Sequence, residues 1–444
     1  MLKVFIFAIL FFLSSNIFAN PLTIHQTNTR YFTDETGRAI YLTGSHTWSN
    51  WADMDDTDPP AAFDFNAFLN FIVSNGHNHF RLWGWAVPHN NSATFDFNYC
   101  NLFPWERTGP GHANDGKLKF DFDTFDTDYF GRLRARVLAA KAVGVYVSIV
   151  LFEFSILEGL TTTGFPFHTG NNINGIESSG TKAYQVTSGS IFNIQKAYIE
   201  EVVDTVNDLD NVLYEICNEG NVASKDWQLA LLSYLQTYQS GKPNQHPIGL
   251  TGTWVTGDDW LWASSSSADY VSPGGTVNDW DDAPPVNNGS KIVLLDTDHI
   301  GNDLTVPWLW MAFTRGHNPI YMDSYGYGPE LGDQAGLRAN MGYSNSYAKR
   351  INLVSMTPST TLCSTQYCLA NNGYEYLIYN TGAGSFTVNL SAAPSTKWFD
   401  VEWFDTLDGS VTAGTPVKGG PSSQSFTAPD GEKVLYLKQK KPPL

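Results

Sequence analysis

The chain has 444 residues and a formal net charge of −18 at pH 7. This negative charge disfavours nucleic acid and anionic membrane surfaces as partners, because both repel acidic proteins. The spacing of the four cysteines, at positions 100, 217, 363 and 368, matches no zinc site, so we expect neither a metal nor another cofactor.

The first 19 residues predict a secretory signal peptide. Lys3 precedes a short apolar run over residues 4–13, and a cleavage site follows Ala19. The run is too short to span a membrane, and no later segment is apolar enough to do so. We therefore expect a mature, monomeric protein that starts at residue 20 and is secreted or periplasmic.

Residues 20–357 predict a parallel α/β domain, because short apolar runs alternate with helical stretches. The expected strands are 40–42, 79–82, 145–151, 212–216, 248–251, 268–272, 291–295 and 320–322. The expected helices are 65–74, 130–143, 192–206, 227–239, 308–315 and 334–354, with a short one before the sixth strand. Eight such units with long insertions at 84–120 and 153–190 predict a (β/α)8 barrel.

Residues 358–444 have a different sequence pattern, in which short runs of alternating apolar and polar residues are separated by Gly, Pro, Asn and Ser. The runs are 374–380, 385–391, 397–405 and 433–439. They predict a small antiparallel β-sandwich, and the lack of a long linker predicts that it packs on the barrel. Within it, Cys363 and Cys368 could form a disulfide in an oxidising compartment, whereas Cys217 in the barrel is typical of a small buried residue.

Polar and aromatic side chains gather at the carboxyl ends of the expected barrel strands, where barrels of this kind place their chemistry. In strand order they are His46 and Trp48; Arg81, Trp83 and Trp85; Glu153; Asn218 and Glu219; Asp296, Asp298 and His299; Asp323 and Tyr325. We expect these side chains to meet at one mouth of the barrel.

The Asn218-Glu219 step in YEICNEG resembles the Asn-Glu of clan-A glycoside hydrolases, where the glutamate at the end of the fourth strand is the general acid/base. The segments YLTGSHTWSNWADM, FRLWGW and LLDTDHIG extend the resemblance over nearly the whole mature chain. The C-terminal module resembles a small β-sandwich named for collagen binding. The seventh strand departs from the clan, because it ends in aspartates where the clan has a glutamate.

Glycoside hydrolysis needs two carboxyl groups, one protonated and one ionised. Glu219 suits the acid role, because a barrel mouth raises a carboxyl pKa by desolvation and by nearby negative charge. For its partner we favour Asp298, with Asp296 one layer deeper, since residues i and i+2 of a strand face the same side. If neither strand-7 aspartate is the second carboxylate, Asp323 is the next candidate and Glu153 a weaker one. Both strand-7 aspartates could instead merely orient Arg81 or His299.

The remaining candidates would bind substrate. They are Asn218, Arg81, His46, Trp48, Trp83, Trp85, His299, Asp323 and Tyr325, as hydrogen-bonding or ring-stacking groups. Each also has a purely structural explanation. The arginine could form a buried ion pair, a histidine could line the barrel with its hydrogen bonds made inside the protein, and the aromatic rings could pack in the core.

These expectations lead to a secreted glycoside hydrolase that acts on a polysaccharide or oligosaccharide. The alternative is a carbohydrate-binding protein on a barrel that has lost catalysis, which the missing strand-7 glutamate would explain. A matrix-adhesion protein is a third hypothesis, and it rests only on the resemblance of the sandwich.

Overall fold

The computed structural model of the chain describes residues 20–89, 99–157, 164–252, 258–263, 266–274, 280–300, 305–325, 334–382 and 384–440. The predicted signal peptide, residues 1–19, lies outside the described residues and stays a prediction. Among the helices of the described part, none is both long and apolar enough to cross a membrane.

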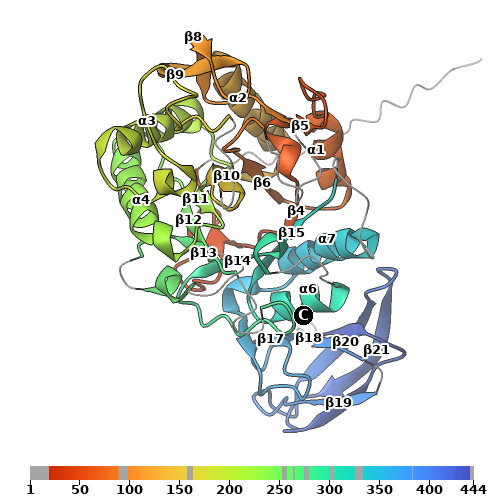
Figure 1. Ribbon diagram of the computed structural model, residues 1–444. Coiled ribbons are helices and arrows are strands. Elements are labelled where there is room, and N and C mark those ends of the chain that lie inside the picture. The colour runs from red at the N-terminus through yellow and green to blue at the C-terminus, as the bar shows by residue number, and fades with distance from the viewer. Residues whose placement is uncertain are drawn as a thin grey trace, which may run out of the picture.

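Eight parallel strands form a nearly closed barrel, as predicted (Figure 1). In sheet order they are β4 Gly44–His46, β15 Asn318–Met322, β14 Ile292–Asp296, β13 Tyr270–Ser272, β12 Ile248–Thr251, β11 Val212–Asn218, β10 Tyr146–Glu153 and β6 His79–Trp83. The two end strands, β4 and β6, lie side by side. Just before them, the backbone N–H of Asn78 donates to Thr43 O over 3.0 Å.

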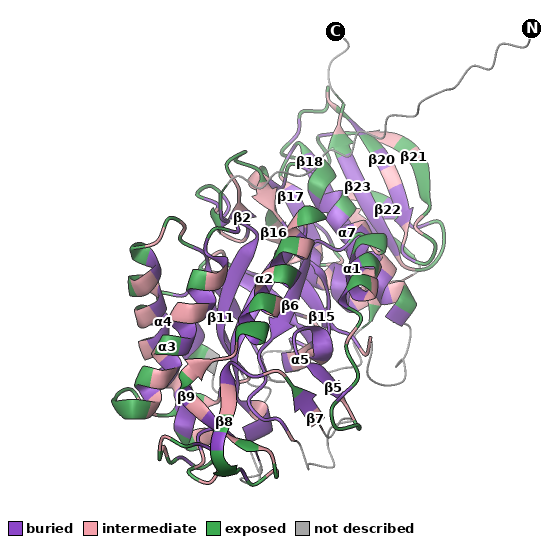
Figure 2. Cartoon of the chain, turned by 90° about the horizontal axis from the view of Figure 1, so that it is seen from above, coloured by how far each residue is buried: buried purple, intermediate pink, exposed green. Residues whose placement is uncertain are grey.

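Helices surround the strands of the barrel, and Figure 2 shows exposed residues on the outer faces of several of them. The α-helices are α1 Phe65–Ser74, α2 Thr127–Ala142, α3 Gly189–Val206, α4 Lys225–Ser240, α5 Thr297–Ile300, α6 Val306–Thr314 and α7 Gln334–Arg350. Short 3-10 helices are η1 Trp48–Asn50, η2 Ser155–Leu157, η3 Gly180–Tyr184, η4 Val222–Ser224, η5 Asp258–Trp262 and η6 Leu353–Ser355.

Local sequence explains why α1 forms where it was expected. Its apolar residues recur at helical spacing, and Phe65, Phe68, Leu69 and Ile72 are all buried. The Asp64 side chain caps the start by accepting the backbone N–H of Ala67. The helix therefore begins and ends as the sequence predicted.

The first barrel strand differs from the prediction. The apolar run expected at 40–42 contributes β3 Ala39–Ile40 to a small antiparallel sheet with β2 Phe32–Thr33 and β1 Thr23–Ile24, and the barrel uses β4 instead. Gly44 in β4 faces the backbone of β6, where a Cβ would lie 2.0 Å from His79 O. Only a glycine permits this close approach, so the closing strand has little apolar character to reveal it.

The insertion expected at 84–120 contains strands that were not predicted. β8 Trp105–His112 pairs antiparallel with β9 Leu118–Phe125, and β5 Asp53–Asp55 pairs with β7 Tyr99–Asn101. Figures 1 and 2 both place the β8–β9 hairpin at the end of the molecule away from the C-terminal sheets. Residues 90–98 and 158–163 of the two insertions lie outside the described residues.

The C-terminal region forms a six-stranded antiparallel sheet covered on one face by a two-stranded one. Its strands are β16 Thr357–Ser359, β17 Cys368–Asn371, β18 Glu375–Asn380, β23 Lys433–Gln439, β20 Trp398–Asp405 and β21 Val411–Lys418, with β19 Ser385–Val388 and β22 Gln424–Thr427 in the small sheet. Cys363 and Cys368 are both buried, and the bridge that the sequence allowed is not formed: the structure has them as free thiols.

The sandwich packs on the barrel, as predicted. Alternate residues of β18 face opposite ways, so that Tyr376 belongs to the apolar cluster that includes residues of the small sheet, and Leu377 belongs to a cluster shared with the barrel. The shared cluster also contains Trp310 of α6, Tyr347 of α7 and Phe404 of β20. One apolar cluster therefore joins the two parts of the chain.

Candidate active site at the carboxyl ends of the barrel strands

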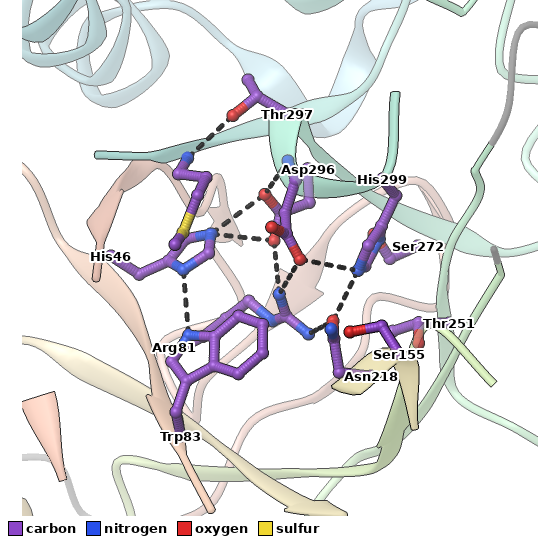
Figure 3. Close-up of polar contacts among 12 residues, drawn as sticks. His46, Arg81, Trp83, Ser155, Asn218, Thr251, Ser272, Asp296, Thr297 and His299 are labelled. Atoms are coloured by element: carbon purple, nitrogen blue, oxygen red, sulfur yellow. Dashed lines mark hydrogen bonds and ion pairs between the residues drawn. The ribbon is translucent and has the colours of Figure 1, made fainter. Parts of the chain in front are cut away.

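Arg81 of β6 is the centre of a buried hydrogen-bond network inside the barrel (Figure 3). Its guanidinium donates to Glu215 through Nε at 3.1 Å and through Nη2, to Asp296 Oδ2 at 2.9 Å and to Asn218 Oδ1 at 2.7 Å. Burial alone would lower the pKa of Arg81, but the charges of Glu215 and Asp296 raise it. The arginine is therefore charged and holds its neighbours in place through buried ion pairs. This is the structural role that was the alternative to substrate binding.

Glu215 was not among the predicted site residues, although its position in the sequence could have indicated it. It is a charged residue in the middle of the otherwise apolar strand β11. Such a residue in a barrel strand needs a buried cation as its partner. Burial raises the pKa of Glu215, while Arg81 opposes that shift.

Asp296, at the end of β14, is held in the ionised form. Trp83 Nε1–H donates to His46 Nδ1 over 3.1 Å, which leaves His46 Nε2–H to donate to Asp296 over 2.9 Å. Burial would raise the pKa of Asp296, but His46 and Arg81 together bring it well below its usual range. Both ring nitrogens of His46 are thus engaged within the protein, and Asp296 acts as a fixed negative charge.

Asn218 links the network to His299. Its Oδ1, which accepts from Arg81, also accepts from His299 Nε2–H at 2.8 Å. The other ring nitrogen, Nδ1, lies 2.9 Å from the hydroxyl of Ser272, a residue that the sequence did not single out. Burial lowers the pKa of His299 to about 3, helped by the charge of Arg81, so the ring is neutral.

Asp298 does not lie on the seventh strand, so the predicted i, i+2 relation with Asp296 is wrong. The strand ends at Asp296 and the chain turns into α5, whose first turn carries Asp298. Its Oδ2 lies 3.8 Å from Arg81 Nη1 and 3.7 Å from His299 Nε2, and has no hydrogen-bond partner among the described residues. Burial and the charge of Asp296 raise the pKa of Asp298 to about 7, although Arg81 opposes them.

Glu219 follows β11 directly and sits in a backbone conformation that is rare for a residue with a side chain, with φ of 48°. Such strained conformations concentrate at functional sites. Burial, the charge of Asp298 and the charge of Glu153 raise the pKa of Glu219 well above its usual range. A raised pKa keeps a carboxyl group protonated to a higher pH than usual, as a general acid requires.

Glu153 lies next to the end of β11, because Glu153, the last residue of β10, is in register with Asn218, the residue before Glu219. Its Oε1 accepts the backbone N–H of Ser155 at 2.7 Å and also the Ser155 hydroxyl. Burial raises the pKa of Glu153 to about 7, although Ser155 opposes the shift. The structure thus brings together Glu153, Glu219 and Asp298.

The three tryptophans lie together and differ in exposure. Trp83 is buried, stacks on Trp85 with ring centroids 6.0 Å apart, and lies 4.6 Å from the guanidinium carbon of Arg81. Trp85 is 8 % exposed and donates to Trp48 O, while Trp48 itself is only partly buried. Trp48 is the most exposed of the three residues, and an exposed indole ring can stack on a sugar.

Asp323 and Tyr325 have structural partners. Asp323 is buried and pairs with Arg338 of α7, whose Nε donates over 2.7 Å. Tyr325 stacks on Phe71 of α1, with ring centroids 4.7 Å apart and planes 29° from parallel. The Asp323 carboxylate thus pairs with α7, and the Tyr325 ring packs on α1.

The arrangement suits proton transfer and attack at one centre. One carboxyl has a pKa raised well above its usual range, a second and a third have pKa values of about 7, and a fourth has a pKa well below its usual range. Pairs of carboxyls with separated pKa values are the signature of acid and base roles. Within the described part of the chain, no three His, Cys, Asp or Glu side chains are grouped so that they could hold a metal ion.

No protein-family model matches the sequence, and a comparison with curated proteins finds no match. Solved structures do match. A family 5 glycoside hydrolase from Bacteroides vulgatus superposes with a TM-score of 0.61 and 14% identity, over 94% of this chain and 93% of that one. A second Bacteroides vulgatus protein, provisionally assigned as a glycoside hydrolase, gives 0.66 and 16% over 95% and 82% of the two chains.

A third structure, described as a glycoside hydrolase, gives a TM-score of 0.61 and 12% identity over 94% of this chain and 97% of that one. At such low identities the likeness concerns the fold. Nothing found bears on the likeness of the sandwich to a collagen-binding module, which stays an expectation. The chain has the barrel fold of clan-A-like glycoside hydrolases, followed by an antiparallel sandwich.

Proposed function

We propose that this protein is a glycoside hydrolase in which Glu219 is the general acid/base and Asp298 is the second carboxylate. The observation that carries the proposal is the electrostatic effect of Asp298 on Glu219: the charge of Asp298 helps to raise the pKa of the Glu219 carboxyl. Asp296 cannot easily serve as the reacting carboxylate, because His46 and Arg81 occupy its oxygens. The shared fold of the solved glycoside hydrolases supports the same reading.

In the reaction, Glu219 gives its proton to the glycosidic oxygen while the bond from that oxygen to the anomeric carbon breaks. The departing sugar leaves as an alcohol. The ionised Asp298 either bonds to the anomeric carbon, as in a retaining enzyme, or takes a proton from the water that attacks it, as in an inverting one. In the retaining case water then attacks the anomeric carbon, the bond to Asp298 breaks, and Glu219 takes the proton of the water; in the inverting case Asp298 keeps that proton.

The substrate is a carbohydrate, and we propose Trp48 as a ring on which one sugar unit stacks. Location and assembly state follow from the sequence alone: we propose a secreted or periplasmic monomer.

The test is release of reducing ends from a panel of polysaccharides and oligosaccharides by the mature chain. For any substrate that is cleaved, Glu219→Gln and Asp298→Asn should each lower kcat/KM by about 10²–10⁴-fold, the typical contribution of a positioned acid or base. Glu201→Gln on the outer helix α3 is the matched control and should be unchanged. Full activity of Glu219→Gln would contradict the assignment. Glycan binding without any product in the unmodified chain would support the non-catalytic alternative.

A further inference from the structure

The side-chain amide of Asn218 has a fixed orientation, because its neighbours determine where its oxygen lies. Arg81 Nη2 lies 2.7 Å from Asn218 Oδ1, and a guanidinium has hydrogen-bond donors but no acceptor. The atom that faces Arg81 is therefore the amide oxygen, and the NH2 group of Asn218 points away from the guanidinium. Since Asn218 directly precedes Glu219, this orientation matters for a sugar bound at the proposed acid.

The same oxygen determines which nitrogen of His299 carries the ring proton. His299 Nε2 lies 2.8 Å from Asn218 Oδ1, and burial lowers the pKa of His299 to about 3, so the neutral ring carries one proton. A bare Nε2 would place its lone pair against the amide oxygen and, at 3.7 Å, against Asp298 Oδ2. Nε2 is therefore the protonated nitrogen, and Nδ1 is the acceptor.

Ser272 holds the other side of the ring. Its hydroxyl lies 2.9 Å from His299 Nδ1, and it donates to that nitrogen because the nitrogen is an acceptor. Ser272 and His299 are 1 % and 0 % exposed, and Figure 3 shows both side chains next to Asn218. With one hydrogen bond at each nitrogen, the imidazole cannot turn without breaking both.

We propose that Ser272 and His299 are positioning residues that, together with Arg81, hold the Asn218 amide so that its NH2 group is presented to a sugar hydroxyl. The inference rests on the proposed function and deepens it, because it names groups that act on the substrate through Asn218. The hydrogen bonds run in one direction and transfer no proton: Ser272 donates to His299, His299 donates to Asn218, and Asn218 donates to the sugar oxygen.

The arrangement draws on four separate elements of the barrel. Ser272 ends β13, His299 lies in α5 after β14, Arg81 lies in β6, and Asn218 ends β11. A side chain that must meet a ligand in one geometry needs surrounding hydrogen bonds that fix its rotamer. Removal of the Ser272 hydroxyl or of the His299 N–H should therefore weaken the contact between Asn218 and the substrate.

The first experiment compares kcat/KM for an aryl glycoside of the cleaved sugar with kcat/KM for analogues that each lack one hydroxyl. The hydroxyl bound by Asn218 is the one whose removal lowers kcat/KM in the unmodified chain but not in Asn218→Ala. The unmodified chain should prefer the full sugar over this analogue by about 2–10-fold, the usual effect of one hydrogen bond. If no hydroxyl behaves in this way, the inference is wrong.

The variants then show whether the preference depends on Ser272 and His299. Ser272→Ala and His299→Leu should bring the preference close to one, with a much smaller effect on the deoxy analogue, because the analogue cannot make the contact. Ser272→Thr keeps the hydroxyl and His299→Gln keeps an N–H donor, so both should retain the preference. A purely structural role would lower kcat/KM for both substrates alike and leave the preference unchanged, which would overturn the inference.

The second experiment needs no substrate. In the unmodified chain with 15N-labelled histidines, NMR distinguishes a protonated ring nitrogen from a bare one, and the His299 signals are those that His299→Gln lacks. We expect a neutral His299 ring with its proton on Nε2 at neutral pH. A proton on Nδ1 would also overturn the inference, because a bare Nε2 cannot donate to Asn218.

Failure of the proposed function looks different from these results. In that case the unmodified chain would cleave no glycoside, and the inference would fall with the function even if the His299 proton were on Nε2. An active enzyme whose preference survives in Ser272→Ala and His299→Leu would contradict the inference alone. Thermal unfolding shows which variants are folded, and if those of Ser272 are not, the His299 pair decides.

Discussion

At the scale of single residues, the barrel mouth divides its buried charges into two groups. Arg81 pairs with Glu215 and Asp296 through direct hydrogen bonds, so that a buried cation faces two buried acids. Asp298 and Glu153 each leave one carboxylate oxygen without a hydrogen bond among the described residues. The first group gives the site its shape, and the second keeps protons mobile near neutral pH, as acid–base chemistry requires.

A carboxyl whose pKa is raised by folding makes the folded state lose stability as pH rises. Asp298 has a pKa of about 7 in the folded chain, raised by burial and by Asp296, against about 3.9 for an unperturbed aspartate. The folded state therefore keeps this proton between those two values, and its advantage is lost as pH rises through about 7.

We therefore expect Asp298→Asn to raise the melting temperature at pH 8 and to change it little at pH 3. Above pH 7 the amide removes a buried negative charge that lies next to Asp296, whereas at pH 3 the native side chain is itself neutral. Differential scanning calorimetry at the two pH values checks the prediction. Asp296→Asn is the comparison, and it should lower the melting temperature at pH 8. The partners of Asp296 lower its pKa, which means that they stabilise the folded state at that pH, and the amide would lose this stabilisation. An equal effect of Asp298→Asn at both pH values would contradict the argument.

At the scale of elements, the strands place the site and close packing between them fixes the barrel. Gly249 of β12 faces the ring of Tyr270 in the neighbouring strand β13, where a Cβ would lie 2.1 Å from two ring carbons. The ring is held in place, since its hydroxyl donates to Tyr214 O over 2.8 Å. The glycine thus makes room inside the barrel for a fixed aromatic side chain.

Gly249→Ala should destabilise the protein by about 1–3 kcal/mol, the usual cost of overfilling a packed core. Gly131→Ala is the matched control, because Gly131 is an exposed residue of α2 with nothing within 4 Å of a built Cβ. It should stabilise the protein by about 0.5–1 kcal/mol, as an alanine in a helix does. Urea unfolding of both variants measures the difference, and a neutral Gly249→Ala would show that the ring can move aside.

Sequence patterns predicted most elements, because apolar runs and caps act locally. The strand Ile248–Thr251 and the strand Lys433–Gln439 begin and end as expected. The strand Gly44–His46 was missed, since close approach to its neighbour requires a glycine rather than apolar residues. The strand Leu118–Phe125 was missed although its sequence, LKFDFDTF, alternates apolar and polar residues.

The site was predictable in outline and not in its pairings. Strand ends identified Glu219 and Asp298 as mouth residues, because parallel strands end at one face of a barrel. The contact of Asp296 with Arg81 was among the alternatives, but the strand ends did not reveal that Arg81 also binds Glu215, or that Ser155 contacts Glu153. Such contacts depend on side-chain directions across strands that are distant in the sequence, which one sequence does not encode locally.

At the scale of the whole molecule, the sandwich and the barrel behave as one packed body. The rings of Trp310 and Tyr347 from the barrel helices lie 5.5 Å and 5.3 Å from the ring of Phe404 in the sandwich. A polar link supports them, since Asn340 accepts from Trp310 Nε1 and donates to Thr406 O, both over 2.8 Å. The sandwich therefore covers apolar surface of α6 and α7 that would otherwise face water.

This shared cluster predicts that a change in the sandwich weakens the whole protein. Phe404 is 3 % exposed, and Phe404→Ala should lower the free energy of unfolding by about 3–5 kcal/mol, since it removes a buried ring between the two parts. Leu407→Ala, three positions along the chain and 89 % exposed, is the control and should stay within about 0.5 kcal/mol. Chemical unfolding followed by tryptophan fluorescence reports on the barrel, because most of the tryptophans lie there. If Phe404→Ala unfolded the sandwich at a lower denaturant concentration while the barrel signal stayed unchanged, the two parts would be independent, and α6 and α7 would not need their cover.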